Sequence, residues 1–120
     1  MAEPASALPL VVVALGGNAL LRRGQPLTAD NQLENIRRAA AQLARVAFSN
    51  ELVLTHGNGP QVGALALQQD AAQDRVPAQP LHQLCAMTQG QLGSVLVRAV
   101  DEQCGPGTAV ALVTHVQVDP

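Results

Sequence analysis

Hydrophobic residues follow two patterns along this chain of 120 residues: short unbroken runs, and longer stretches with a helical period. The runs at residues 10–15 and 52–54 consist of Val, Leu and Ala, which is typical of parallel strands buried on both faces. Apolar side chains recur at spacings of three and four over residues 33–47 and again over 81–103. These two stretches are therefore predicted to be helices, each with one apolar face.

Capping and turn residues set the boundaries of these elements. Thr28 is predicted to cap the first helix, and a second helix should run from the end of the second turn to about residue 69, followed by a loop over residues 70–80. After a Gly-Pro-Gly stop, residues 109–113 are predicted to form a third strand. This order of elements predicts a three-layer α/β/α sandwich with a mainly parallel sheet, or part of one. Residues 1–8 are expected to be a flexible leader, and residues 9–120 a single structural unit.

Glycine-rich turns follow both predicted strands, at residues 16–18 and 56–63. Gly57 and Gly59 allow positive φ and let a ligand approach the main chain closely. Pro60 suits the first helical position, and the free N–H groups of a helix start favour an anion. Because ligands bind beyond the carboxyl ends of parallel strands, the two turns are predicted to face one anion-binding crevice.

Composition and charge narrow the function classes. The net charge is −2 with 13% charged residues and a single aromatic, Phe48, so the chain offers neither a basic face nor a stacking platform for nucleic acid. The first apolar run is too short to cross a membrane, and a cytoplasmic protein is expected. All seven basic residues are arginines. Neither glycine turn continues into a Walker A sequence or has the spacing of a dinucleotide fingerprint.

Metal binding and covalent catalysis find no support in the residue spacing. Cys85 and Cys104 form no CxxC pair, and the three histidines lack the spacing of metal ligands. No protein-held metal site is therefore predicted. A nucleophile with a neighbouring base is also not visible, so the spacing gives no support to covalent catalysis.

The two turns together, in residues 12–20 and 55–63, closely resemble the carbamate kinase family of the amino acid kinase superfamily. Residues 86–93 and 116–119 also resemble that family. The resemblance implies reversible phosphoryl transfer between carbamoyl phosphate and ADP, giving ATP and carbamate, with Mg²⁺ bound to ADP or ATP, in a homodimer that serves arginine catabolism. The family subunit is more than twice as long, and the nucleotide site and catalytic lysines would lie outside these residues. This chain thus resembles the N-terminal, substrate-binding part, and alone it is expected to be inactive.

The resemblance also assigns roles to the turn residues. Gly17 and Asn18 would contact the transferring phosphoryl group, the first through its backbone and the second through its amide. The predicted substrate-binding residues are Gly16, Gly17, Asn18, His56, Gly57, Asn58 and Gly59. Two other functions stay open. One is another amino acid kinase, such as an acetylglutamate kinase, whose first strand carries a lysine where Ala14 stands here. The other is a non-catalytic module that binds small anions.

Overall fold

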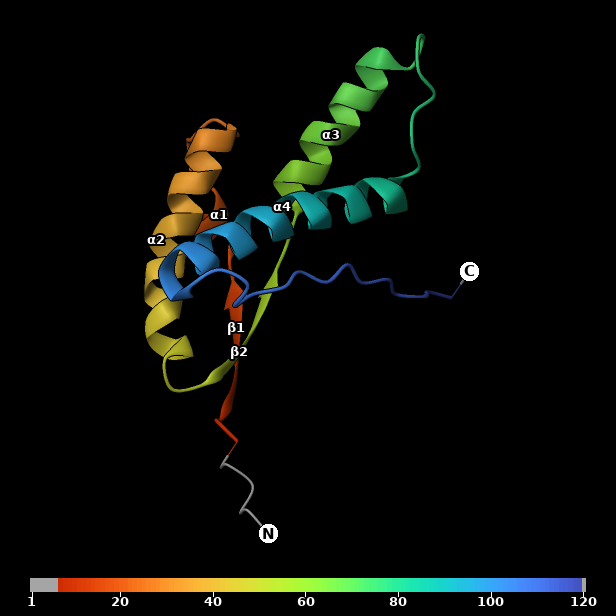
Figure 1. The fold of residues 1–120 in the computed structure, drawn as a ribbon. Helices are drawn as coiled ribbons and strands as arrows, with labels where there is room; N and C mark the ends of the chain where they lie inside the picture. Colours follow the sequence, from red (N-terminus) through yellow and green to blue (C-terminus); the bar gives the residue numbers. More distant parts are fainter. Residues whose placement is uncertain (1–6, 120) are drawn as a thin grey trace.

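The computed structural model describes residues 7–119, which form an α/β unit around two parallel strands (Figure 1). Strand β1 spans Leu10–Leu15 and strand β2 spans Glu51–His56. They pair in parallel, with Leu10 opposite Glu51 and Leu15 opposite His56. The predicted α/β fold with a parallel sheet is confirmed, and the predicted leader, residues 1–8, lies almost entirely outside the described residues.

Helices α1 (Gly17–Leu20) and α2 (Ala29–Ala47) connect the two strands. The hydroxyl of Thr28 accepts a hydrogen bond of 3.2 Å from the backbone N–H of Asn31. Thr28 therefore caps α2 as predicted, since this bond satisfies one of the N–H groups that a helix start leaves free.

Helices α3 (Gly59–Ala72) and α4 (Leu81–Cys104) follow β2. Helix α3 extends one turn beyond the predicted end, so residues 70–72 are helical and do not belong to the loop. Gly105 caps the C-terminal end of α4, and its φ of 108° lies in the range that glycine adopts most easily. In Figure 1, α3 projects away from the layer formed by α2 and α4. None of the described helices is both long enough and apolar enough to cross a membrane.

The hydrophobic core lies between α2, α4 and one face of the sheet. Leu15 of β1 and Leu54 of β2 pack against it from the strands. Its fully or nearly buried members are Leu20, Ile36, Ala40, Leu92, Leu96, Ala99 and Val100. The apolar stripes predicted for the two long helices therefore meet each other in this core.

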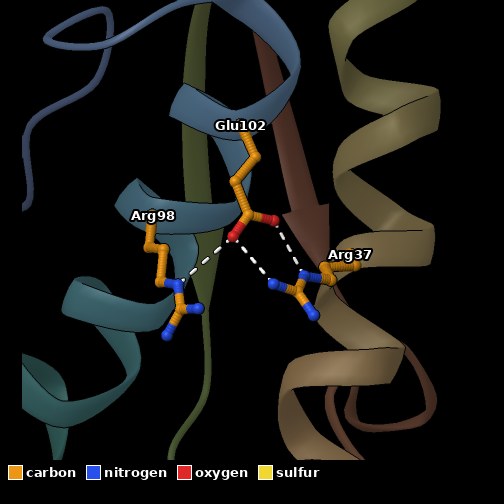
Figure 2. A network of polar contacts seen from close by, with 3 residues as sticks. All are labelled: Arg37, Arg98 and Glu102. Atoms are coloured by element: carbon orange, nitrogen blue, oxygen red, sulfur yellow. Dashed lines mark hydrogen bonds and ion pairs between the residues drawn. The ribbon is translucent and has the colours of Figure 1, made fainter.

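A charged network joins α2 to α4 on the surface of this core (Figure 2). Glu102 accepts hydrogen bonds of 2.7 and 2.8 Å from Arg37, and a third of 3.2 Å from Arg98. The hydrogen bond from Arg37, supported by Arg98, lowers the pKa of Glu102 from 4.5 to about 2. Glu34 lies three residues before Arg37 and four before Arg38, and it pairs with Arg38 within α2. Arg37 instead turns to α4, where both carboxylate oxygens of Glu102 accept hydrogen bonds from it.

The predicted third strand, residues 109–113, is not a strand. This segment runs back along α4, where Ala111 lies against Gly93 and Gln89 bonds to the backbone of Thr114 (Figure 1). A strand needs a neighbour with which to exchange backbone hydrogen bonds. Here the segment contacts helix side chains, and the sheet of the described residues consists of β1 and β2.

Burial on both faces of the strands is also contradicted. Side chains in β1 and β2 alternate between exposed and half-buried, and Leu10 and Val12 are each 63% exposed. The reason is that, among residues 7–119, helices cover only one face of the sheet. A radius of gyration of 17.2 Å, against about 14 Å for a compact domain of this length, agrees with this open arrangement.

Candidate functional site

The first glycine turn begins where β1 ends and starts α1. Gly16 has an extended backbone (φ −72°, ψ 165°) and caps α1, and its carbonyl accepts a hydrogen bond of 2.9 Å from the N–H of Ala19. The N–H groups of Gly17 and Asn18 belong to the first turn of this helix, where no intrahelical acceptor exists for them. The turn thus presents backbone donors beyond the end of the strand.

The second turn begins at His56, the last residue of β2, and starts α3. Nδ1 of His56 lies 3.2 Å from the carbonyl oxygen of Gly57. Asn58 is the N-cap residue of α3, and Pro60 is the second helical residue, not the first as predicted. The N–H groups of the first and second helical residues both lack an intrahelical acceptor. A proline, which has no N–H, therefore loses no helical hydrogen bond at either position.

Both turns line one cavity of about 230 Å³. The parallel register places Leu15 beside His56, so the two strands deliver their turns to the same edge of the sheet. The lining residues are Gly17, Leu20, Leu21, Gly57, Gly59, Pro60 and Gln61. The predicted crevice between the turns is therefore present, and no charged side chain lines it.

The structure brings three of the predicted site residues into this wall, Gly17, Gly57 and Gly59. Gly16, Asn18, His56 and Asn58 lie in the same turns but do not line the cavity, and Asn18 is exposed. The ligand contacts assigned to these residues stay predictions.

The turn glycines do not adopt the positive φ that the sequence suggested. Of the described glycines, only Gly24, Gly105 and Gly107 do so. A Cβ added at Gly16, Gly17, Gly57 or Gly59 would meet no protein atom within 4 Å. The space beside the backbone of these turn glycines is therefore open, and a ligand can come close to it.

Asn58 ties the second turn to α4. Its amide nitrogen donates to Oγ1 of Thr88 at 2.8 Å and to the carbonyl oxygen of Cys85 at 3.1 Å. Thr88 is completely buried and donates in turn to the carbonyl of Leu84. The side-chain amide of Asn58, a predicted substrate-binding residue, is thus engaged within the protein and holds the second turn against α4.

Gln61 is the residue that sequence reasoning missed. It is the third residue of α3, it is 3% exposed, and neither atom of its side-chain amide has a hydrogen-bond partner among the described residues. A polar residue directly after the glycine turn was the available signal. Gln61 also lines a second cavity of about 390 Å³ between α2, α3 and α4, together with Gln32, Gln68 and Gln91.

The charged groups with shifted pKa values lie outside both cavities. Asp101 accepts hydrogen bonds from the N–H groups of Gly107, Ala109 and Thr108, which lower its pKa and hold the segment after α4. Within the described part of the chain, His, Cys, Asp and Glu side chains do not gather in groups of three or more.

Comparison with known proteins decides the family, since residues 9–118 match the Amino acid kinase family. The chain belongs to the amino acid kinase family. Among curated members, it is 57% identical over 86 residues to the carbamate kinase of Haemophilus influenzae, covering 72% of this chain and 27% of that protein. It is 47% identical over 110 residues to the carbamate kinase of Escherichia coli K12, covering 92% of this chain and 37% of that protein.

Solved structures of the amino acid kinase family agree with this match. Carbamate kinase from Giardia lamblia bound to AMP-PNP superposes with a TM-score of 0.76 at 40% identity, over 81% of this chain and 34% of that one. A structure of the same enzyme thiocarbamoylated by disulfiram gives a TM-score of 0.78 at 37% identity, over 89% and 35%. The chain spans about a third of the length of the relatives it matches.

Proposed function

We propose that this chain is the substrate-binding part of a carbamate kinase, which transfers a phosphoryl group between carbamoyl phosphate and ADP. The observation that carries this proposal is the cavity of about 230 Å³ between two glycine turns on paired parallel strands. Relatives that are 47–57% identical to this chain are named carbamate kinases, which supports the proposal that this chain binds the same substrates.

The geometry suits a small anion with an uncharged body. The first N–H groups of α1 and α3 have no intrahelical acceptor, and the positive end of the α3 dipole adds to them. Glycines at the cavity wall leave room for phosphate oxygens to reach these donors. Backbone groups that are already positioned need no reorganisation when charge develops on the transferring group.

The chain's own contribution to catalysis is thus binding and orientation. In-line transfer needs both partners to be held in register, and the two helix starts on paired strands would hold the carbamoyl phosphate side of that reaction. Mg²⁺ bound to the nucleotide phosphates would neutralise charge there when present. A cytoplasmic location, a homodimeric assembly and a role in arginine catabolism rest on the resemblance alone and stay predictions.

The test is an assay of the complete gene product with ADP, Mg²⁺ and carbamoyl phosphate, in which ATP is followed by coupled luminescence. Formation of ATP in proportion to enzyme is expected. N-acetylglutamate with ATP serves as the control for another amino acid kinase activity. If only the control reaction proceeds, the assignment to carbamate is wrong.

A further inference from the structure

Gln61 is a buried polar residue that the fold leaves without a hydrogen-bond partner among the described residues. Its side chain is 3% exposed, and both amide atoms lack a hydrogen-bond partner in the part of the chain that the structure describes. Buried amide atoms are nearly always paired in folded proteins, because an unpaired one has lost water without replacement. Both amide atoms of Gln61 are therefore available to a partner from outside the described protein atoms.

The position of Gln61 indicates which partner is available. It lines the cavity between the glycine turns, and the other lining residues contribute only glycine, leucine and proline side chains. Gln61 therefore has the one polar side chain among the residues that line this cavity. Backbone N–H groups can bind the anionic end of a ligand there. They are donors, however, so they cannot accept a hydrogen bond from an N–H group of the ligand.

We propose that the side-chain amide of Gln61 recognises the carbamoyl group of the substrate. A carbamoyl group carries an NH₂ donor next to a carbonyl acceptor, and a glutamine amide carries the matching pair. Oε1 of Gln61 would accept from the NH₂, and Nε2 would donate to the carbonyl oxygen. Both amide atoms are enclosed in the conformation described, so binding requires the side chain to rotate toward the cavity that Gln61 already lines.

This inference rests on the proposed function, since it names the group of carbamoyl phosphate to which Gln61 would bind. Its competitor is a structural role, in which water in the larger cavity of about 390 Å³ satisfies the amide. The two differ in one respect. Recognition of the carbamoyl group makes binding depend on the NH₂ of the ligand, whereas a structural role does not.

Two stable probes isolate that NH₂ group. Phosphonoacetamide keeps the amide and a phosphonate, and acetonylphosphonate replaces only its NH₂ with a methyl group. We would measure both dissociation constants by calorimetry on the complete gene product without nucleotide. Wild-type protein should prefer phosphonoacetamide by about tenfold or more, because the methyl analogue leaves a buried acceptor unpaired. Gln61→Met, which keeps the shape of the side chain, should abolish this preference.

Gln68→Met is the matched control, because Gln68 lies on the same helix and lines the larger cavity but not the smaller one. It should keep the wild-type preference. Loss of the preference in Gln61→Met alone supports recognition by Gln61. An unchanged preference in Gln61→Met, or an equal loss in both variants, overturns it.

A second measurement uses wild-type protein labelled with ¹⁵N-glutamine, which removes any dependence on how the variants fold. The side-chain amide resonance of Gln61 should shift with phosphonoacetamide and much less with acetonylphosphonate. A resonance that neither probe moves overturns the inference. The ATP assay keeps the two proposals separate: a wild-type protein that makes ATP but shows no preference that depends on Gln61 refutes only the role of Gln61. A wild-type protein that shows this preference but makes no ATP refutes only the kinase.

Discussion

The amide nitrogen of Asn58 donates a hydrogen bond of 2.8 Å to Oγ1 of Thr88, a side chain with no solvent exposure in the middle of α4. Sequence alone placed Asn58 in a ligand-binding turn and residues 81–103, which include Thr88, in a helix with one apolar face. Their bond shows that the second turn is held from behind by α4, through residues 30 positions apart.

Asn58→Ala should therefore affect both stability and turnover. Removing a partner of a buried polar group costs about 1–3 kcal/mol of unfolding free energy, and a turn that is no longer held should lower kcat/KM at least tenfold. Thr88→Val is the companion variant, since it breaks the same bond from the other side. Equal losses of activity in both would indicate that Asn58 positions the turn. A much larger loss in Asn58→Ala would indicate direct contact with the ligand, and unchanged kcat and KM would remove Asn58 from the site.

Gly17→Val should abolish ligand binding and leave folding intact. No protein atom lies within 4 Å of an added Cβ at Gly17, and its φ is not positive, so the protein itself tolerates a side chain there. The branched side chain would occupy the cavity that Gly17 lines. Thermal melting and calorimetry with phosphonoacetamide measure the two effects separately. Gly63→Val is the control, because Gly63 is equally uncrowded but lines neither cavity. Normal binding by Gly17→Val would show that the first turn is structural only.

Gly93→Ala should detach the segment after α4. An added Cβ would lie 2.7 Å from the Cβ of Ala111, and overpacking of this kind costs about 1–3 kcal/mol. Amide hydrogen exchange at Thr114, whose N–H is bonded to Gln89, should become faster. Gly90→Ala is the control, because nothing lies within 4 Å of a Cβ added at Gly90. In this variant, amide hydrogen exchange at Thr114 should stay slow. The double variant Gly93→Ala with Ala111→Gly should restore the protection. Failure to restore it would mean that this contact does not hold the segment.

Glu102→Gln should remove a pH-dependent part of the stability. The pKa of Glu102 is lowered from 4.5 to about 2 by its hydrogen bonds to Arg37 and Arg98, so its contribution is full above pH 4.5 and is lost as the pH falls toward 2. The difference in unfolding midpoint between wild type and Glu102→Gln should thus be largest near pH 7 and shrink below pH 4.5. Urea unfolding at stepped pH values measures it. Glu34→Gln, which breaks the pair within α2, should give a smaller difference. A difference that does not change with pH would contradict this view of the network.

The isolated chain of 120 residues should show no kinase activity. Its turns supply backbone dipoles, but the transferring phosphoryl group also needs full positive charge and a held nucleotide, and the chain contains no lysine. Purified chain is mixed with carbamoyl phosphate, ADP and Mg²⁺, and ATP is followed by luminescence. The carbamate kinase of Escherichia coli, of which this chain spans 37%, serves as the positive control. ATP above background that disappears with Asn18→Ala or Asn58→Ala would refute the prediction.

Local pattern was sufficient for the parts of the fold that depend on neighbours in the sequence. The bounds of β1, the cap at Thr28 and the extent of α4 were predicted nearly to the residue, because helix and strand periods and capping are properties of short stretches. The meeting of the two glycine turns was also predictable. Parallel pairing of consecutive strands leaves little choice about which ends come together.

Competition between distant partners was decided only by the tertiary structure. Arg37 pairs with Glu102 and not with Glu34, and Asn58 bonds to Thr88. Residues 109–113 do not extend the sheet, and Ala111 lies against Gly93 of α4. Each outcome depends on which group the folded chain brings within hydrogen-bonding or packing distance. Gln61 is the clearest case, because its sequence position predicts only a helix start. Its importance comes from burial without a partner, which exists only once α3 is placed against the rest of the protein.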